Sequence, residues 1–157
     1  MRNKRVVNAT PKEYMGISFR SILERDTYKA MKEAGLEPEY ERYRFILQDS
    51  KHFKVYQYIP YKDRKSHKDT WGLFPYKTLS IKYTPDFVVK RGKTLFIIEC
   101  KGYQTEKYPY QKRLFMNYLE KNIPDSVFME IHNKQQLDKA IKLITEWKEE
   151  ALETSAG

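Results

Sequence analysis

The segments YTPDFVV at residues 83–89 and FIIECKG at residues 96–102 decide how this chain folds. Both contain runs of aromatic and β-branched residues, which favour β-strands. Arg91-Gly92 between them predicts a tight turn, because glycine adopts the backbone conformations that such turns need. The pattern therefore predicts a hairpin with strands at Leu79–Lys90 and Lys93–Lys101.

Charged side chains end the second predicted strand. Because side chains alternate across a strand, Glu99 and Lys101 are expected on one face and the Cys100 thiol on the other, toward the core. Residues 95–98 have the composition of a strand that is buried on both faces, so a glutamate and a lysine that continue it need partners. The predicted hairpin would bring Asp86, on the neighbouring strand, close to Glu99.

Two carboxylates and an ammonium group at one strand end form a candidate site for a hard divalent cation. Mg²⁺ prefers oxygen ligands, commonly one or two carboxylates completed by water and substrate phosphate. The main-chain carbonyl of Cys100 is a further candidate ligand, and Lys101 is expected to orient water and to stabilise negative charge. The alternative is a surface Glu99–Lys101 ion pair with Asp86 as a turn residue.

The remaining sequence predicts an α/β domain with a small mixed β-sheet flanked by helices. Helical spacing of apolar residues, caps and stops indicate the helices, and alternation of polar and apolar residues indicates the strands. One domain is expected over residues 1–157, with a flexible basic arm at 1–9 and a flexible tail at 153–157. The other expected elements are a short helix from Thr10, helices at Ser18–Ala34, Pro109–Asn122 and Lys134 to about Leu152, strands at Glu39–Gln48, His52–Ile59 and Ser126–His132, and a loop at Pro60–Trp71.

The charge balance indicates a polyanionic partner. The chain has 30 lysines and arginines against 21 aspartates and glutamates, a formal charge of +9 that suits nucleic acid. Its 13 tyrosines and 8 phenylalanines can stack on bases, although a strand-rich core would use them equally well.

The sequence also limits where the protein is expected to work. It has no run of 18 apolar residues, so no membrane span is expected, and its basic N-terminal residues lack the apolar stretch of a signal peptide. Cys100 is the single cysteine, which suits a reducing compartment. We therefore expect a cytoplasmic protein with no membrane partner.

The motif Pro85-Asp86 followed by Glu99-x-Lys101 resembles the signature of the PD-(D/E)xK nuclease superfamily. Taken with FRSILE at residues 19–24 and EYE at residues 39–41, it is similar to the phage endonuclease I family of Holliday junction resolvases and to related small phage and prophage nucleases. The likeness runs in order over residues 16–120. The chain departs from the resolvases by an insert near residues 49–77 and by its residues after 120, so chemistry carries over better than substrate choice.

The resemblance implies a restriction-endonuclease-like core that binds Mg²⁺ or Mn²⁺. Asp86 and Glu99 would be metal ligands, Lys101 the catalytic lysine, and Glu24 the helix-borne acid at a second metal. Ser21 and Glu24 also match a helix capping box, an ordinary structural feature. A helix that begins near Ser18 would carry Glu24 beyond its first turn, which favours the catalytic interpretation.

Basic residues near these motifs are candidates for contacts with DNA phosphates, which position a protein without reading sequence. For the residues after the second strand, a solvated helix face is an equally good interpretation. The insert at 49–77 is either a flap that contacts DNA or a solvated loop. The candidate DNA-binding residues are Arg20, Lys107, Lys112 and Arg113.

The resemblance further implies a metal-dependent DNA endonuclease that leaves 5′-phosphate and 3′-hydroxyl ends. We expect a structure-selective enzyme of phage or prophage origin, acting on branched DNA in a bacterial cell. A homodimer would supply two sites for the two strands of a four-way junction. The alternatives are a less selective DNA nuclease, a catalytically inactive DNA-binding module of the same fold, and an RNA-processing enzyme.

Overall fold

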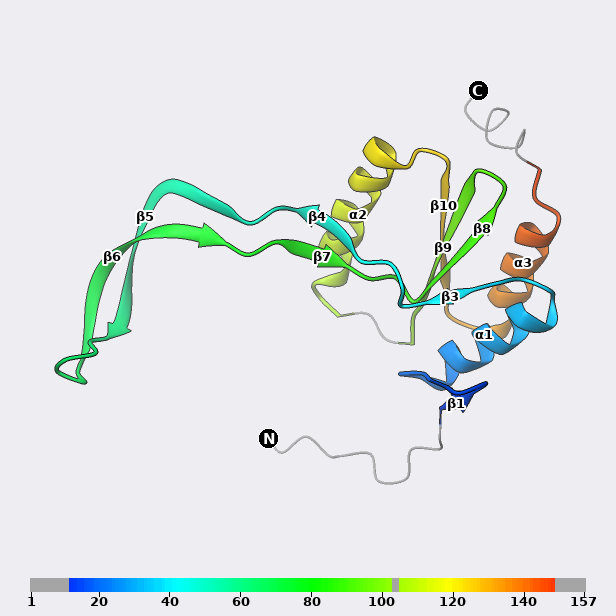
Figure 1. The fold of residues 1–157 in the computed structure, drawn as a ribbon, viewed down its shortest axis with the longest axis horizontal. Helices are drawn as coiled ribbons and strands as arrows, with labels where there is room; N and C mark the ends of the chain where they lie inside the picture. The colour runs from blue at the N-terminus through cyan, green and yellow to red at the C-terminus, as the bar shows by residue number, and fades with distance from the viewer. Residues whose placement is uncertain (1–11, 103–104, 149–157) are drawn as a thin grey trace. The chain divides into compact units, whose positions relative to one another are not determined.

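The computed structural model describes residues 12–102 and 105–148, which divide between two compact units (Figure 1). The insert near residues 49–77 lies within the second unit, Phe45–Tyr83. Its strands are β4 (Phe45–Gln48), β5 (Lys51–Lys62), β6 (Asp69–Thr78) and β7 (Ile81–Tyr83). The first unit contains β1 (Glu13–Tyr14), β2 (Ile17–Ser18), α1 (Ile22–Glu33), β3 (Glu39–Tyr40), β8 (Phe87–Arg91), β9 (Thr94–Cys100), α2 (Tyr108–Asn122), β10 (Ser126–Ile131) and α3 (Lys134–Thr145).

The first unit is built on a four-stranded mixed sheet with the order β10-β9-β8-β3. Strand β9 pairs antiparallel with β8 and parallel with β10, and β3 pairs antiparallel with β8. Two parallel neighbours need a crossover connection, and α2 provides it between β9 and β10. The expected α/β class with a small mixed sheet flanked by helices is confirmed.

Helices cover both faces of this sheet, with α2 on one side and α1 and α3 on the other (Figure 1). Phe96 and Ile98 belong to the core cluster that includes Met31 of α1 and Ile144 of α3. On the opposite face, Phe115 of α2 packs against Phe128 of β10, with the ring centroids 6.0 Å apart. Burial on both faces explains why the middle of β9 is continuously apolar.

The expected helix at Ser18–Ala34 is observed as α1, which begins only at Ile22. The helix predicted from Thr10 is wrong within the described residues, where β1 and β2 pair antiparallel. Met15 and Gly16 between them have φ of 52° and 77°, so the chain reverses in a tight turn. Thr10 itself, the arm at 1–9 and the tail at 153–157 lie outside the described residues.

Both long strands that flank the second unit are interrupted. The strand expected at Glu39–Gln48 is divided into β3 and β4, and Glu41 between them has a φ of 46°. The strand expected at Leu79–Lys90 is divided into β7 and β8, because Pro85 has no N–H with which to continue a ladder. The Glu41 N–H donates to the Asp86 carbonyl at 2.9 Å, which ties the two interruptions together.

The loop predicted at Pro60–Trp71 is confirmed only for residues 63–68, because β5 continues to Lys62 and β6 begins at Asp69. The predicted helix after β9 and the predicted strand at Ser126–His132 are observed as α2 and β10. The C-terminal helix is shorter than expected, since α3 ends at Thr145. Within the described ranges, no helix has the length and apolar character needed to span a membrane.

Replacing Phe115 with Ala should reduce the free energy of unfolding by about 3–5 kcal/mol, because the ring is 0% exposed and its loss leaves a cavity. Tyr110, on the same helix, is 76% exposed, so Tyr110→Ala should change the stability by less than about 0.5 kcal/mol. Urea unfolding followed by circular dichroism measures both values. Equal losses in the two variants would contradict this packing of α2.

Candidate active site

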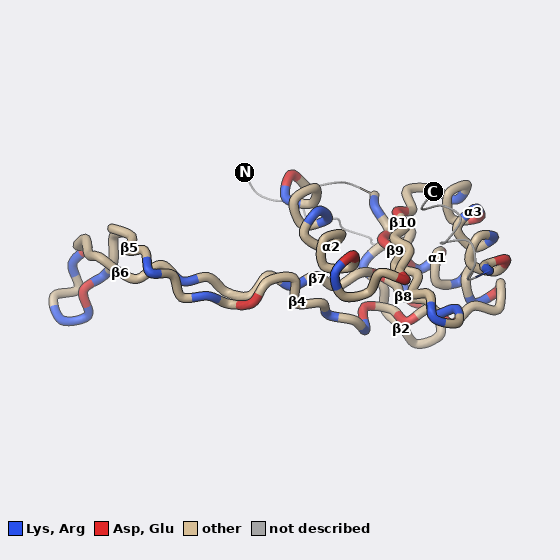
Figure 2. The backbone as a smooth tube through the Cα atoms, turned by 90° about the horizontal axis from the view of Figure 1, so that it is seen from above, with Lys and Arg blue, Asp and Glu red and all other residues tan. Residues whose placement is uncertain are grey.

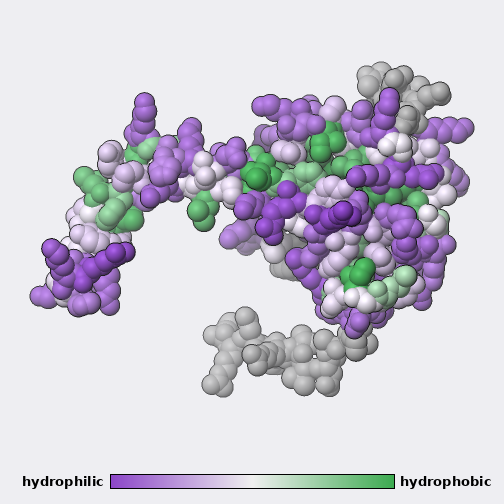
Figure 3. All heavy atoms as spheres, viewed as in Figure 1, coloured by the Kyte–Doolittle hydropathy of each residue, from purple (hydrophilic) through white to green (hydrophobic). Residues whose placement is uncertain are grey.

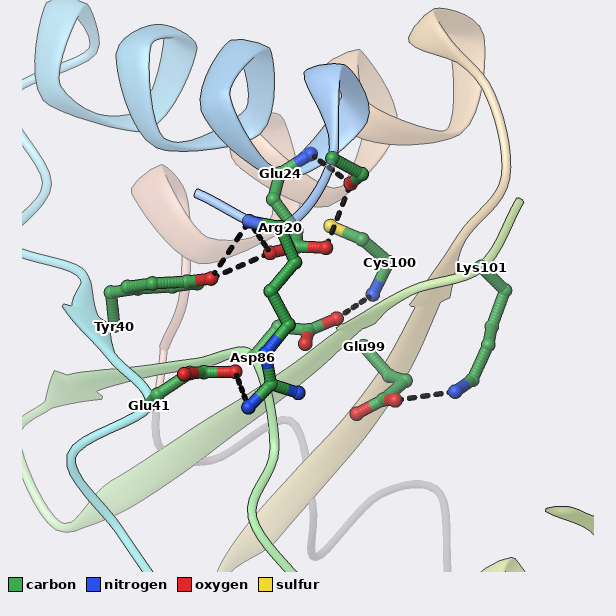
Figure 4. A network of polar contacts seen from close by, with 9 residues as sticks. Arg20, Glu24, Tyr40, Glu41, Asp86, Glu99, Cys100 and Lys101 are labelled. Carbon is green, nitrogen blue, oxygen red and sulfur yellow. Dashed lines mark hydrogen bonds and ion pairs between the residues drawn. The ribbon is translucent and has the colours of Figure 1, made fainter. Parts of the chain in front are cut away.

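Asp86 and Glu99 lie side by side at one end of the β8–β9 hairpin (Figure 4). Phe87 pairs with Ile98, so the residue before β8 is opposite Glu99. The Cys100 N–H donates to Oδ2 of Asp86 at 2.7 Å. The two acids are only 8% and 6% exposed. The hairpin therefore brings the two carboxylates together as the sequence predicted.

The environment of Asp86 opposes its ionisation. Burial and the negative charge of Glu99, with a lesser effect of Glu24, raise the pKa of the Asp86 carboxyl to about 7, although the Cys100 N–H and Lys101 act in the opposite direction. Near neutral pH both the protonated and the ionised form of the Asp86 carboxyl are therefore populated. A cation placed beside it would favour the ionised form.

Lys101 is held between a carboxylate and an aromatic ring. Its Nζ lies 2.5 Å from Oε1 of Glu99 and 4.0 Å from the centroid of the Tyr108 ring. The main-chain N–H of Lys101 donates to the carbonyl of Ile131, which aligns the end of β9 with β10. The ammonium group is thus fixed next to the acid pair and is largely buried.

The Cys100 side chain points away from the acid pair, as predicted. Its thiol lies 3.5 Å from the Thr27 hydroxyl of α1. Burial raises the pKa of the thiol to about 12, so it stays protonated at neutral pH and has no nucleophilic character. Cys100 contributes to the site through its main chain.

Glu24 is a capping residue, because α1 begins at Ile22 and not near Ser18 as the sequence predicted. Ser21 is the N-cap of α1, its hydroxyl accepts the Glu24 N–H at 3.1 Å, and it donates to Oε1 of Glu24 at 2.7 Å. The Tyr40 hydroxyl and the Arg20 N–H both donate to Oε2 of Glu24, at 2.7 and 3.1 Å. Burial and the bond to Glu24 raise the pKa of Tyr40, so it remains a donor.

The same bonds hold the Glu24 carboxylate rigidly on the side of Asp86 opposite Glu99 (Figure 4). Its negative charge raises the pKa of Asp86, which means that the helix carboxylate lies within electrostatic reach of the hairpin pair. Capping and a role in the site are therefore compatible. The capping box determines where the third acid is.

The donor set suits a hard divalent cation. Within residues 12–102 and 105–148, no three His, Cys, Asp or Glu side chains are close enough together to enclose a metal ion. The available oxygens are the carboxylates of Asp86 and Glu99 and the carbonyl of Cys100, and Mg²⁺ commonly takes one or two carboxylates and completes its shell with water and phosphate. The raised pKa of Asp86 fits a site that is more stable with a cation than without one.

The candidate DNA-binding residues differ in their surroundings. Arg20 is exposed, and its guanidinium is 2.7 Å from Oε1 of Glu41. Lys107 and Arg113 are also exposed. Lys112 is partly buried and forms an ion pair with Glu130 at 2.9 Å, so it is less available to a phosphate than a solvated lysine would be.

Tyr108 and Glu130 are site residues that the sequence interpretation missed. Glu130 is in register with Glu99 on β10 and accepts a hydrogen bond from the Tyr108 hydroxyl. Burial alone would raise the pKa of Glu130, but the bonds from Tyr108 and Lys112 outweigh it and lower the pKa below its ordinary value. A charged residue within the apolar run VFMEI was the available signal, whereas Tyr108 gave none.

Asp86→Asn should remove a pH dependence of folding in metal-free buffer. The pKa of Asp86 in the folded chain is about 7 against an ordinary 3.8, so the folded chain keeps a proton that the unfolded chain releases. The free energy of unfolding of the parent should therefore fall as the pH rises from about 4 to 7, by at most about 4 kcal/mol. The variant should be more stable than the parent at pH 8.

Thermal unfolding at pH 5 and pH 8 in EDTA measures this difference. Asp138→Asn is the control, because that aspartate is exposed on α3. A gain from Asp86→Asn that is equal at both pH values would contradict the raised pKa.

Comparison with known proteins finds no family model, no curated protein and no solved structure that matches this chain.

Proposed function

We propose that this protein is a metal-dependent endonuclease that hydrolyses phosphodiester bonds in DNA. The observation that carries the proposal is the buried Asp86–Glu99 pair with the ammonium group of Lys101 2.5 Å from Glu99. Burying two neighbouring carboxylates is costly unless a cation offsets their charge. Apolar residues at these two positions would stabilise the fold at least as well as buried acids. Binding of a cation therefore explains the presence of the two carboxylates better than a structural role does.

Asp86 and Glu99 would hold the divalent cation, with the Cys100 carbonyl as a further ligand. The bound cation would act as a Lewis acid that offsets negative charge on the scissile phosphate. Lys101 would orient the attacking water and stabilise the added charge as the water oxygen bonds to phosphorus. The bond from phosphorus to the 3′ oxygen then breaks, and the products are a 5′-phosphate and a 3′-hydroxyl.

Glu24 would act from the opposite side of Asp86. Its carboxylate is already fixed by Ser21, Tyr40 and Arg20, so it needs no rearrangement to serve a second cation or to orient water. Preorganised charges of this kind are the most effective contributors to catalysis. The exposed Arg20, Lys107 and Arg113 supply positive charge by which DNA can approach a cluster of acids.

The substrate that we propose is branched DNA, cut by a homodimer in the cytoplasm of a bacterial cell that carries the phage or prophage. The resemblance of the FRSILE, YTPDF and ExKG motifs to the phage resolvases supports this choice. Two strands must be cut in a four-way junction, and a two-fold symmetric dimer supplies two sites.

Asp86→Asn and Glu24→Gln should each lower the cleavage rate by about a hundredfold or more, because each removes a carboxylate that would hold a cation or orient water at the reacting phosphate. Glu33→Gln is a matched control, since Glu33 is an exposed acid on the same helix as Glu24. Cleavage of labelled four-way junction, nicked and linear duplex DNA in Mg²⁺ or Mn²⁺ measures the rates, and EDTA should abolish them.

Several results of this assay would contradict the proposal. Full activity of Asp86→Asn would mean that this site does not take part in cleavage. Binding of DNA by the parent without cleavage in either metal would favour an inactive DNA-binding module. Equal cleavage of junction and linear duplex would indicate a less selective DNA nuclease. Faster cleavage of RNA than of DNA would indicate an RNA-processing enzyme.

Tyr108 should act as a positioning residue for Lys101. Tyr108→Leu removes the ring on which the ammonium group lies and should lower kcat about tenfold with little change in KM. Tyr108→Phe keeps the ring and loses only the bond to Glu130, so it should restore most of kcat. Steady-state cleavage of a junction substrate measures both constants, and equal losses in the two variants would mean that the hydroxyl matters instead.

A further inference from the structure

The hairpin formed by β5 and β6, residues 51–78, has one face that its own packing leaves uncovered. Directly paired residues of an antiparallel ladder point to the same face. The pairs on this face are Tyr56 with Pro75, Tyr58 with Leu73 and Pro60 with Trp71. We call these six residues the aromatic face. Tyr58 and Trp71 are 64% and 57% exposed, and their ring centroids are 5.4 Å apart.

The opposite face of the hairpin packs on itself. The Tyr61 and Phe74 rings meet edge to face at 5.1 Å. Gly72 leaves room for them, because a Cβ at that position would lie 2.8 Å from the Tyr61 ring. The aromatic face is therefore not the surface that holds the two strands together. Figure 3 shows green hydrophobic residues among paler and purple ones on the surface of this hairpin.

Positive charge surrounds the aromatic face. The hairpin has 7 lysines and arginines against 2 aspartates, so its formal charge is +5 of the +9 of the whole chain. Figure 2 shows these cations along both strands and at the tip. Asp63, one of the two acids, accepts hydrogen bonds from Ser66 and Lys65, which lower its pKa. That turn presents Arg64, Lys65 and Lys68 together.

We infer that the aromatic face binds unpaired nucleotides of a DNA strand, with bases stacked on Tyr58 and Trp71 and phosphates on the surrounding cations. Exposed rings among cations are the means by which single strands are bound without sequence preference. Paired bases hide their faces in the duplex, and the aromatic face offers few groups that could read base edges in a groove. The choice of DNA as the polyanion rests on the proposed function.

Two features oppose pairing of this hairpin with a second copy of itself. A charge of +5 on each copy is repulsive, whereas it attracts a polyanion. Pro60 lies in β5 and Pro75 in β6, and neither has an N–H to donate to an added strand.

Three fluorescent 20-mers in EDTA test the inference: oligothymidylate, an abasic strand with the same phosphates, and duplex DNA. The parent should bind oligothymidylate at least about tenfold more tightly than the abasic strand, because only the former has bases to stack. Tyr58→Ala/Trp71→Ala should lose at least about tenfold on oligothymidylate and nothing on the abasic strand. Tyr58→Phe/Trp71→Phe keeps an aromatic ring at both positions and should bind like the parent.

Leu143→Ala is the control for loss of exposed apolar surface, because Leu143 is an exposed residue of α3. Its binding should match that of the parent. Unchanged binding of oligothymidylate by Tyr58→Ala/Trp71→Ala would overturn the inference. If the parent is a dimer and that variant is a monomer that still binds oligothymidylate normally, the aromatic face is a contact between two copies of the chain. Tenfold tighter binding of oligouridylate than of oligothymidylate would overturn the choice of DNA.

These results are separable from those of the cleavage assay, because the binding needs no metal. If the parent cuts DNA and the ring variant binds normally, only the inference fails. If the parent cuts nothing but prefers oligothymidylate to the abasic strand through these rings, the nuclease proposal fails and the binding face stands.

Discussion

The repulsion between two buried carboxylates determines which other charges the end of the β8–β9 hairpin needs. Asp86 and Glu99 are brought together by the register of the β8–β9 hairpin and cannot both be ionised without compensation. The chain supplies part of it through Lys101 and the Cys100 N–H. Around this pair lie other charges that are fixed by their own networks, Glu24 on one side and Glu130 on the other. A proton or a cation must provide the rest.

Both faces of the sheet are packed, but the end of β9 places different residues on each of them. Strand β9 directs Phe96 and Ile98 toward α1 and α3, where the main core lies, and its next residue Cys100 continues into that core. The alternate residues Glu99 and Lys101 face α2, whose Tyr108 lies against the lysine. One strand thus carries the centre of the core and the centre of the site, and a shift in its register would exchange them.

Much of this arrangement could be predicted from the sequence because it depends on local periodicity. The alternation at Glu99, Cys100 and Lys101 fixed their faces, and the Arg91-Gly92 turn fixed the hairpin. The Glu24 network could not be predicted in the same way, since Tyr40 reaches it from 16 residues along the chain. The predicted start of α1 was too early, because the apolar spacing was followed to Ser18 although Ser21 is the N-cap. Strand β6 was missed because the residues that lead into it are polar and resemble a loop.

The ends of the second unit meet, since Phe45 pairs with Tyr83. A segment whose first and last residues are neighbours costs the carrier fold little more than a short loop would, because the entropy of closing a loop grows only slowly with its length. Such a segment can therefore vary in length and sequence with little effect on the fold that carries it. The segment could be gained, lengthened or exchanged during evolution without rebuilding the sheet, so that its contacts change while Asp86 and Glu99 stay in place.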